Sequence, residues 1–169
     1  MKNVVRFIIG ILLVVVVQSC SQKDSIESSL NLTAPSGELI SENTISLKKE
    51  ISAAIALKHG IDGDDFQITK IDYVPLKTGY SATITYKYDN DKEDVIIKAY
   101  NVRFTYTAQS IVIPDDKGRS AGNRSILISC KSEKCSCKPV VTLGVDSELH
   151  YTCEGCDDCS LIISSPDNK

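Results

Sequence analysis

Six cysteines gathered in the last third of the chain are the residues best suited to do chemistry. They fall into two groups of three: Cys130, Cys135 and Cys137, followed by Cys153, Cys156 and Cys159. An even number of clustered cysteines is typical of disulfides in a protein that leaves the cytosol. Disulfide formation is our leading interpretation, and the spacing alone leaves the pairing open.

Metal binding is the competing interpretation. The segment CSC at 135–137 is followed 15 residues later by CEGC at 153–156, which approaches the four-cysteine zinc pattern but has a first pair one residue too short. Zinc or copper(I) would suit such thiolates, and His150 is a candidate additional ligand, although a histidine inside a strand is more often simply packed. The CxxCxxC run at 153–159 resembles part of a ferredoxin motif, but it lacks the fourth cysteine and its proline, which argues against an iron–sulfur cluster. A reactive disulfide pair at 153–156 is disfavoured because the motif follows a strand and does not begin a helix.

Other catalytic chemistry has few possible centres. The chain has only His59 and His150, and it contains no GxSxG, HExxH or phosphate-binding glycine loop. The acidic turn at 62–65 has its glycine in the wrong place for a calcium-binding EF-hand. We therefore expect no catalytic residue, and we interpret His59 as a residue of the last helical turn that favours the helix dipole.

The elements that would position the cysteines begin with a helix. Apolar residues at helical spacing predict an amphipathic helix over 44–59, ended by Gly60. Strands are predicted over 66–74, 80–88 and 95–106, with a polar hairpin turn at 89–92. Residues 80–88 alternate between apolar and polar side chains, so we expect one face of an antiparallel sheet to be buried and the other exposed. The helix should pack across the buried face, which is an α+β arrangement.

The cysteine-rich part is predicted to contain short strands over 110–113, 125–129, 140–145, 148–152 and 161–163. Folding 140–152 as a hairpin would bring the two cysteine groups together, whether they form disulfides or bind metal. We expect a helix-on-sheet region at 43–113 and a cysteine-rich β segment at 114–169 that belongs to the same domain.

The beginning of the chain predicts export. Lys2 and Arg6 precede an uninterrupted apolar run of 11 residues, FIIGILLVVVV at 7–17. Crossing a bilayer takes about 20 apolar residues, so this run is too short for a membrane-spanning helix and fits a cleaved signal peptide better.

The residues that follow resemble a lipobox. The sequence VQSC at 17–20 is similar to the cleavage site of bacterial lipoproteins, apart from the bulky Gln18. The resemblance is limited to residues 1–25 and implies cleavage of residues 1–19, lipidation of Cys20 and attachment to a membrane. The segment SQKDS at 21–25 resembles a signal for display on the outer membrane surface, or it is a plain polar linker. Serine-rich residues 20–42 are predicted to form a flexible tether.

The charge of the chain argues against a nucleic-acid-binding protein. The formal net charge is −3 at pH 7, and no cluster of lysine and arginine is present, so nucleic acid is an unexpected partner. We expect a lipid-anchored protein of the bacterial envelope, placed in the outer membrane, that binds or supports an unidentified partner without catalysis and without a cofactor. The alternative function is binding of zinc or copper by the cysteine cluster. The absence of a catalytic motif favours a protein that is not an enzyme.

Overall fold

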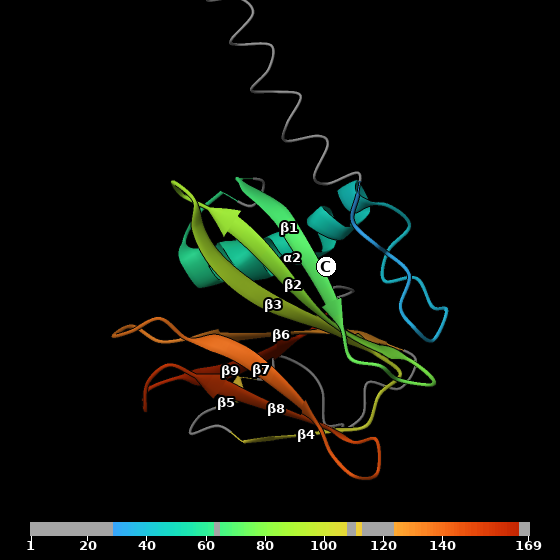
Figure 1. The fold of residues 1–169 in the computed structure, drawn as a ribbon. Helices are drawn as coiled ribbons and strands as arrows, with labels where there is room; N and C mark the ends of the chain where they lie inside the picture. Colours follow the sequence, from blue (N-terminus) through green and yellow to red (C-terminus); the bar gives the residue numbers. More distant parts are fainter. Residues whose placement is uncertain (1–28, 63–64, 108–110, 113–123, 166–169) are drawn as a thin grey trace, which may run out of the picture.

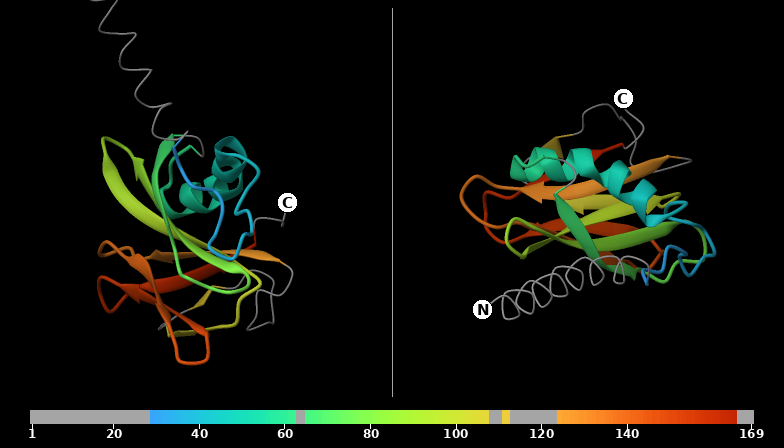
Figure 2. Two further views of the ribbon diagram at one scale, coloured as in Figure 1. Left: turned by 45° about the vertical axis from the view of Figure 1, so that its right-hand side comes forward. Right: turned by 90° about the horizontal axis from the view of Figure 1, so that it is seen from above.

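The fold has three layers, a helix, a large sheet and a small sheet, seen here in a computed structural model. The structure describes residues 29–62, 65–107, 111–112 and 124–165. Figures 1 and 2 show helix α2 at one side of the molecule and strands β4 and β8 at the other, with the large sheet between them. The α+β class expected from the sequence, one helix packed on an antiparallel sheet and followed by cysteine-rich strands, is confirmed.

Helix α2 spans Thr44–His59, as the apolar spacing predicts. The side chain of Asn43 caps its first turn by accepting a hydrogen bond from the backbone N–H of Ser46 at 2.8 Å, which satisfies one of the free donors at a helix start. Gly60 ends the helix in the left-handed conformation with φ of 66°, which costs glycine little. Leu47, Ile51 and Ile55 form its buried stripe.

The large sheet has six strands in the order β1-β2-β3-β6-β9-β5. The strands are β1 (Phe66–Tyr73), β2 (Tyr80–Tyr88), β3 (Lys92–Tyr100), β5 (Ile111–Val112), β6 (Ser125–Lys131) and β9 (Ser160–Ser164). Neighbours are antiparallel except for β5, which runs parallel to β9. Strands β6 and β9 from the cysteine-rich part therefore lie in the same sheet as the three strands of the meander.

The small sheet has the order β4-β8-β7. Its strands are β4 (Phe104–Thr107), β7 (Lys138–Leu143) and β8 (Leu149–Glu154). Strands β7 and β8 form the expected antiparallel hairpin, and β4 runs parallel to β8. Pro139 lies in β7, an edge strand, where the missing N–H of proline is tolerated.

Two apolar cores lie on opposite faces of the large sheet. Consecutive residues of β3 divide between them, because Ile96 packs in the core under α2 and Ile97 packs in the core under the small sheet. Leu127 and Ile128 of β6 divide in the same way. Side chains of a strand alternate between its faces, and each fully buried isoleucine or leucine contributes about 1.5–3 kcal/mol.

The second face of the sheet is less exposed than the alternation in β2 predicts. Ser81 points away from the helix, but the small sheet covers it and it is fully buried. The Tyr151 hydroxyl of the small sheet donates a hydrogen bond to the Ser81 hydroxyl at 3.1 Å. The expectation of an exposed second face is therefore wrong at this end of β2. A polar residue of this kind gives no sign in the sequence that another sheet will cover it.

The strand predicted over 95–106 is two strands in two different sheets. β3 ends at Tyr100, and Asn101 has a φ of 51° that turns the chain toward β4. Gly79 packs against this turn, since a Cβ atom on Gly79 would lie 2.4 Å from the carbonyl oxygens of both Tyr100 and Asn101. The turn carries no proline or glycine of its own, which is why the sequence pattern missed it.

The flexible tether expected over 20–42 is too long at its C-terminal end. Ala34, Ile40 and Ser41 are buried. The ammonium of Lys98 in β3 donates hydrogen bonds to the carbonyl of Ile40 and to the carboxylate of Glu50. These contacts attach the segment to the sheet and to the helix, so the described residues before α2 belong to the folded domain.

No helix within the described ranges is long and apolar enough to cross a membrane. The predicted leader at 1–19, Cys20 and the polar residues 21–25 lie outside these ranges. Residues 110 and 113 of the strand predicted over 110–113, and residues 114–123 after it, also lie outside the described ranges.

Candidate cysteine site

All six cysteines after Cys20 are paired at disulfide distance. The pairs are Cys130–Cys153, Cys135–Cys156 and Cys137–Cys159, with Cα–Cα separations of 5.8, 6.5 and 5.9 Å. These separations lie within the usual range for disulfides, about 4.4–6.8 Å. Every bridge joins one cysteine of the first group to one of the second. The structure thus gives the pairing that the spacing alone left open.

The Cys130–Cys153 bridge joins the two sheets. Cys130 lies in β6 of the large sheet opposite Leu161, and Cys153 lies in β8 of the small sheet opposite Pro139. The Cys130 side chain is fully buried in the core between the sheets. This bridge is a covalent link across an apolar interface.

The other four cysteines lie in two adjacent loops. Cys135 and Cys137 precede β7, and Cys156 and Cys159 precede β9. Gly155 allows the loops to approach, since a Cβ atom on it would lie 2.2 Å from the Ser136 carbonyl oxygen. Its φ of 144° is also one that residues with side chains rarely adopt.

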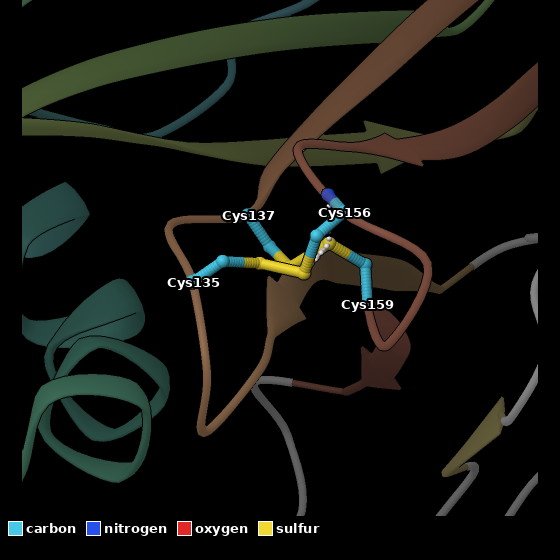
Figure 3. A group of neighbouring side chains, drawn as sticks. All are labelled: Cys135, Cys137, Cys156 and Cys159. Atoms are coloured by element: carbon cyan, nitrogen blue, oxygen red, sulfur yellow. Dashed lines mark hydrogen bonds between the residues drawn. A yellow bond between two sulfur atoms is a disulfide. The ribbon is translucent and has the colours of Figure 1, made fainter.

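The sulfur atoms of these four cysteines form one compact group, which we call the cysteine quartet: Cys135, Cys137, Cys156 and Cys159. Figure 3 shows the four side chains pointing toward one another from the two loops, with two disulfides lying side by side. All four Sγ atoms lie within 4.8 Å of one another. The two sulfurs of the CxC pair are 3.9 Å apart, and so are those of Cys156 and Cys159.

The quartet is only partly shielded from solvent. Cys137 and Cys159 are buried, whereas Cys135 and Cys156 are half-buried. A groove of about 570 Å³ runs between β2, β3 and β7 and reaches Ser136 and Gly155, which flank the quartet. Another groove, of about 450 Å³, is bordered by Lys134 and Asp158 of the same loops. Small solutes can therefore approach the Cys135–Cys156 disulfide, whose two cysteines are half-buried.

The quartet differs in one member from the set that the zinc spacing pointed to. That spacing paired CSC at 135–137 with CEGC at 153–156, whereas Cys153 is bonded to Cys130, and Cys159 joins the quartet. The β7–β8 hairpin brings the two loops together, as expected, but the register of its strands directs Cys153 toward Cys130. Only the tertiary structure decides which cysteines are neighbours.

His150 lies apart from the quartet in the described structure. Its Nδ1 is 2.9 Å from the Thr105 hydroxyl and its Nε2 is 3.1 Å from the Thr107 hydroxyl, both on the neighbouring strand β4. Both ring nitrogens thus have hydrogen-bond partners that are not cysteines. A role of His150 as a metal ligand remains a prediction.

A second polar cluster, not anticipated from the sequence, lies at the end of α2. The Asp94 carboxylate is buried at the start of β3, 2.6 Å from the Lys58 ammonium. The Nε2 atom of His59 lies 3.2 Å from the Asp94 carboxylate and 2.8 Å from the Tyr86 hydroxyl. The His59 ring also stacks on Tyr88, with ring centroids 3.8 Å apart. The last turn of the helix is thereby fixed to the sheet, and the His59 side chain is only partly exposed.

The charges of this cluster stabilise one another. Burial by itself raises the pKa of Asp94, but hydrogen bonds from His59, Lys58 and the Val95 backbone outweigh it and hold the pKa below its ordinary value. Burial lowers the pKa of Lys58, and the hydrogen bond to Asp94 acts in the opposite direction. Burial raises the pKa of Tyr86, so its hydroxyl stays protonated. The sequence gave no signal for this cluster, because Asp94 lies just before the strand predicted over 95–106.

The α2 cluster is connected to the quartet. The Lys58 ammonium also donates a hydrogen bond to the Cys137 carbonyl at 3.2 Å. Lys58 therefore connects the end of the helix to both the large sheet and the CxC loop.

Comparisons of the chain with models of known protein families, with curated protein sequences and with solved structures found no match.

Proposed function

We propose that this protein is a lipid-anchored, non-enzymatic module of the bacterial cell envelope that binds or supports a partner outside the cytosol. The observation that carries the proposal is the pairing of all six C-terminal cysteines at disulfide distance. Disulfides persist in oxidising compartments and are rare in the cytosol. A chain that needs three of them is suited to the envelope or the cell surface.

The N-terminal sequence supports the same compartment independently. A short apolar run followed by VQSC at 17–20 fits a leader that is cut before Cys20, whose thiol then receives lipid. Several acyl chains give stable membrane attachment, because each buried CH₂ contributes about 0.8 kcal/mol.

The domain itself is built for rigidity. Its two cores lie on opposite faces of one sheet, and a disulfide links that sheet to the small sheet covering it. A rigid scaffold presents its loops in fixed positions, which is an advantage for binding outside the cell. These features favour a binding or structural module over an enzyme.

The test is the chemical state of the protein produced in a Gram-negative bacterium with labelled palmitate. We expect label in the membrane fraction, a chain that begins at Cys20, and no thiol that reacts with an alkylating agent before reduction. Cys20→Ser should lose the label and retain residues 1–19. Cys130→Ser is the matched control, because it removes a cysteine outside the lipobox and should keep the label. A cytosolic, unlabelled wild-type chain with its thiols free would contradict the proposal.

A further inference from the structure

The distances between the sulfur atoms of the quartet are close to those of a tetrahedral metal site, except within the two disulfide bonds. Zinc bound by four thiolates has Zn–S distances of about 2.3 Å, which place neighbouring sulfurs about 3.8 Å apart. The two pairs that are close in sequence already have Sγ atoms 3.9 Å apart. No two of the four Sγ atoms are more than 4.8 Å apart. Opening the Cys135–Cys156 and Cys137–Cys159 bonds would complete the tetrahedron with movements of about 2 Å or less.

The surroundings of the quartet also suit thiolates. The backbone N–H of Cys156 lies 3.3 Å from the Cys159 sulfur and points a donor at it. Hydrogen bonds and nearby positive charge favour the thiolate form. The Lys58 ammonium lies beside the CxC loop, bound to the Cys137 carbonyl.

The third disulfide lies outside this group. Cys130 is fully buried in the core between the two sheets, and Cys153 is half-buried. Neither of their sulfur atoms belongs to the quartet, so a change of the bonds within the quartet leaves this link between the sheets in place. The fold can therefore hold its sheets together while the quartet changes its state.

We propose that the quartet is a two-state site, which holds two disulfides when oxidised and one Zn²⁺ ion when reduced. A dithiol reductant supplies the electrons: each disulfide takes two electrons and two protons from one dithiol, which becomes a cyclic disulfide. Zn²⁺ then binds the four sulfurs and displaces their four protons. The inference goes beyond the proposed function, since lipid attachment neither requires nor excludes it.

The test uses the full chain, oxidised or treated with a dithiol and then freed of excess reductant. We expect the oxidised protein to bind no Zn²⁺ and the reduced protein to bind one ion per chain. Co²⁺ in place of Zn²⁺ should give the absorption of a tetrahedral tetrathiolate complex. Bound Zn²⁺ should slow alkylation of the quartet cysteines, mapped by mass spectrometry, by more than about tenfold.

Paired variants separate the quartet from the third disulfide. Cys137→Ser with Cys159→Ser should raise the Kd for Zn²⁺ by more than about 100-fold, because even an outer-shell group changes metal affinity by about 10–100-fold. Cys130→Ser with Cys153→Ser is the matched control and should still bind one ion. The inference is overturned if reduced wild-type protein binds no Zn²⁺, or if Zn²⁺ fails to protect the quartet from alkylation in the wild-type chain. Because the last measurement needs no variant, it decides the matter even if the control pair does not fold.

Discussion

Replacing Asp94 by asparagine should destabilise the fold strongly, because it leaves a buried ammonium without its counter-charge. The side chains of Lys58 and Asp94 are 7% and 6% exposed, and their charged atoms are 2.6 Å apart. Asparagine keeps the size of the side chain and a carbonyl oxygen that can accept the hydrogen bond from the Val95 N–H. The substitution removes the charge and replaces the Oδ2 atom that faces Lys58 and His59 with an NH2 group, which cannot accept their hydrogen bonds.

The expected loss in the free energy of unfolding is about 3 kcal/mol. Removing one partner of a buried ion pair costs about 3–5 kcal/mol. We place the effect at the lower end for two reasons. The Lys58 ammonium keeps its hydrogen bond to the Cys137 carbonyl, and burial already lowers the pKa of Lys58, so the lysine can lose its proton at a limited cost.

Urea unfolding of the oxidised protein at pH 7 measures this loss. The matched control is Asp72→Asn, which breaks the Lys70–Asp72 pair at 2.8 Å with side chains 65% and 53% exposed. Exposed pairs contribute about 0–1 kcal/mol. Adding Lys58→Met to Asp94→Asn should recover part of the stability, because the double variant no longer buries an unpaired charge.

The effect of Asp94 should depend on pH with a defined sign. Its folded-state pKa lies below the ordinary value, so the contribution is complete above the unfolded-state pKa of about 3.9 and is lost as the pH falls through the folded-state pKa. The stability gap between wild type and Asp94→Asn should therefore narrow below about pH 4. If Asp94→Asn costs no more than Asp72→Asn, or if the gap widens in acid, the ionic account of this cluster is wrong.

The remaining predictions concern the cysteine loops. Gly155→Ala should cost about 2–4 kcal/mol and slow correct oxidation, because its Cβ would meet the Ser136 carbonyl oxygen at 2.2 Å; Gly37→Ala, whose φ is also positive but which has open space around it, should cost only about 1 kcal/mol. Thermal unfolding with thiol counting checks both. Replacing both Cys130 and Cys153 by alanine should lower the free energy of unfolding by about 3 kcal/mol, from the chain entropy of a bridge with a sequence separation of 23; an unchanged urea midpoint would contradict this role of the bridge.

Local patterns in the sequence predicted the individual elements well. Helix α2 has the predicted limits because its apolar spacing, Asn43 cap and Gly60 stop all act within a few residues. Strand β2 also has the predicted limits, since its alternating side chains match a sheet with a buried face. Where a break depends on a distant contact, as at Asn101 beside Gly79, the pattern ran two strands together.

The site was predicted only as a set of residues. The even number and spacing of the cysteines indicated disulfides or a metal, but their partners depend on the register of the β7–β8 hairpin and on the crossing of two sheets. The Asp94 cluster gave no motif, because Lys58 and His59 meet Asp94 only when the helix lies on the sheet, and Tyr86 lies opposite Asp94 only once β2 and β3 are paired. A site whose residues come from distant segments of the chain cannot be predicted from the spacing of residues in the sequence.

The sequence by itself determined which segments form the helix and the meander strands, because those choices follow from periodicity and from capping within a few neighbouring residues. It also determined that the six cysteines lie close enough in the chain to react with one another. The tertiary structure decided that the last strands extend the large sheet and that a small sheet covers its second face. It also decided that Cys159, and not Cys153, joins the quartet. These outcomes depend on contacts between residues far apart in the chain, where the fit of buried side chains decides between arrangements that the local pattern allows equally.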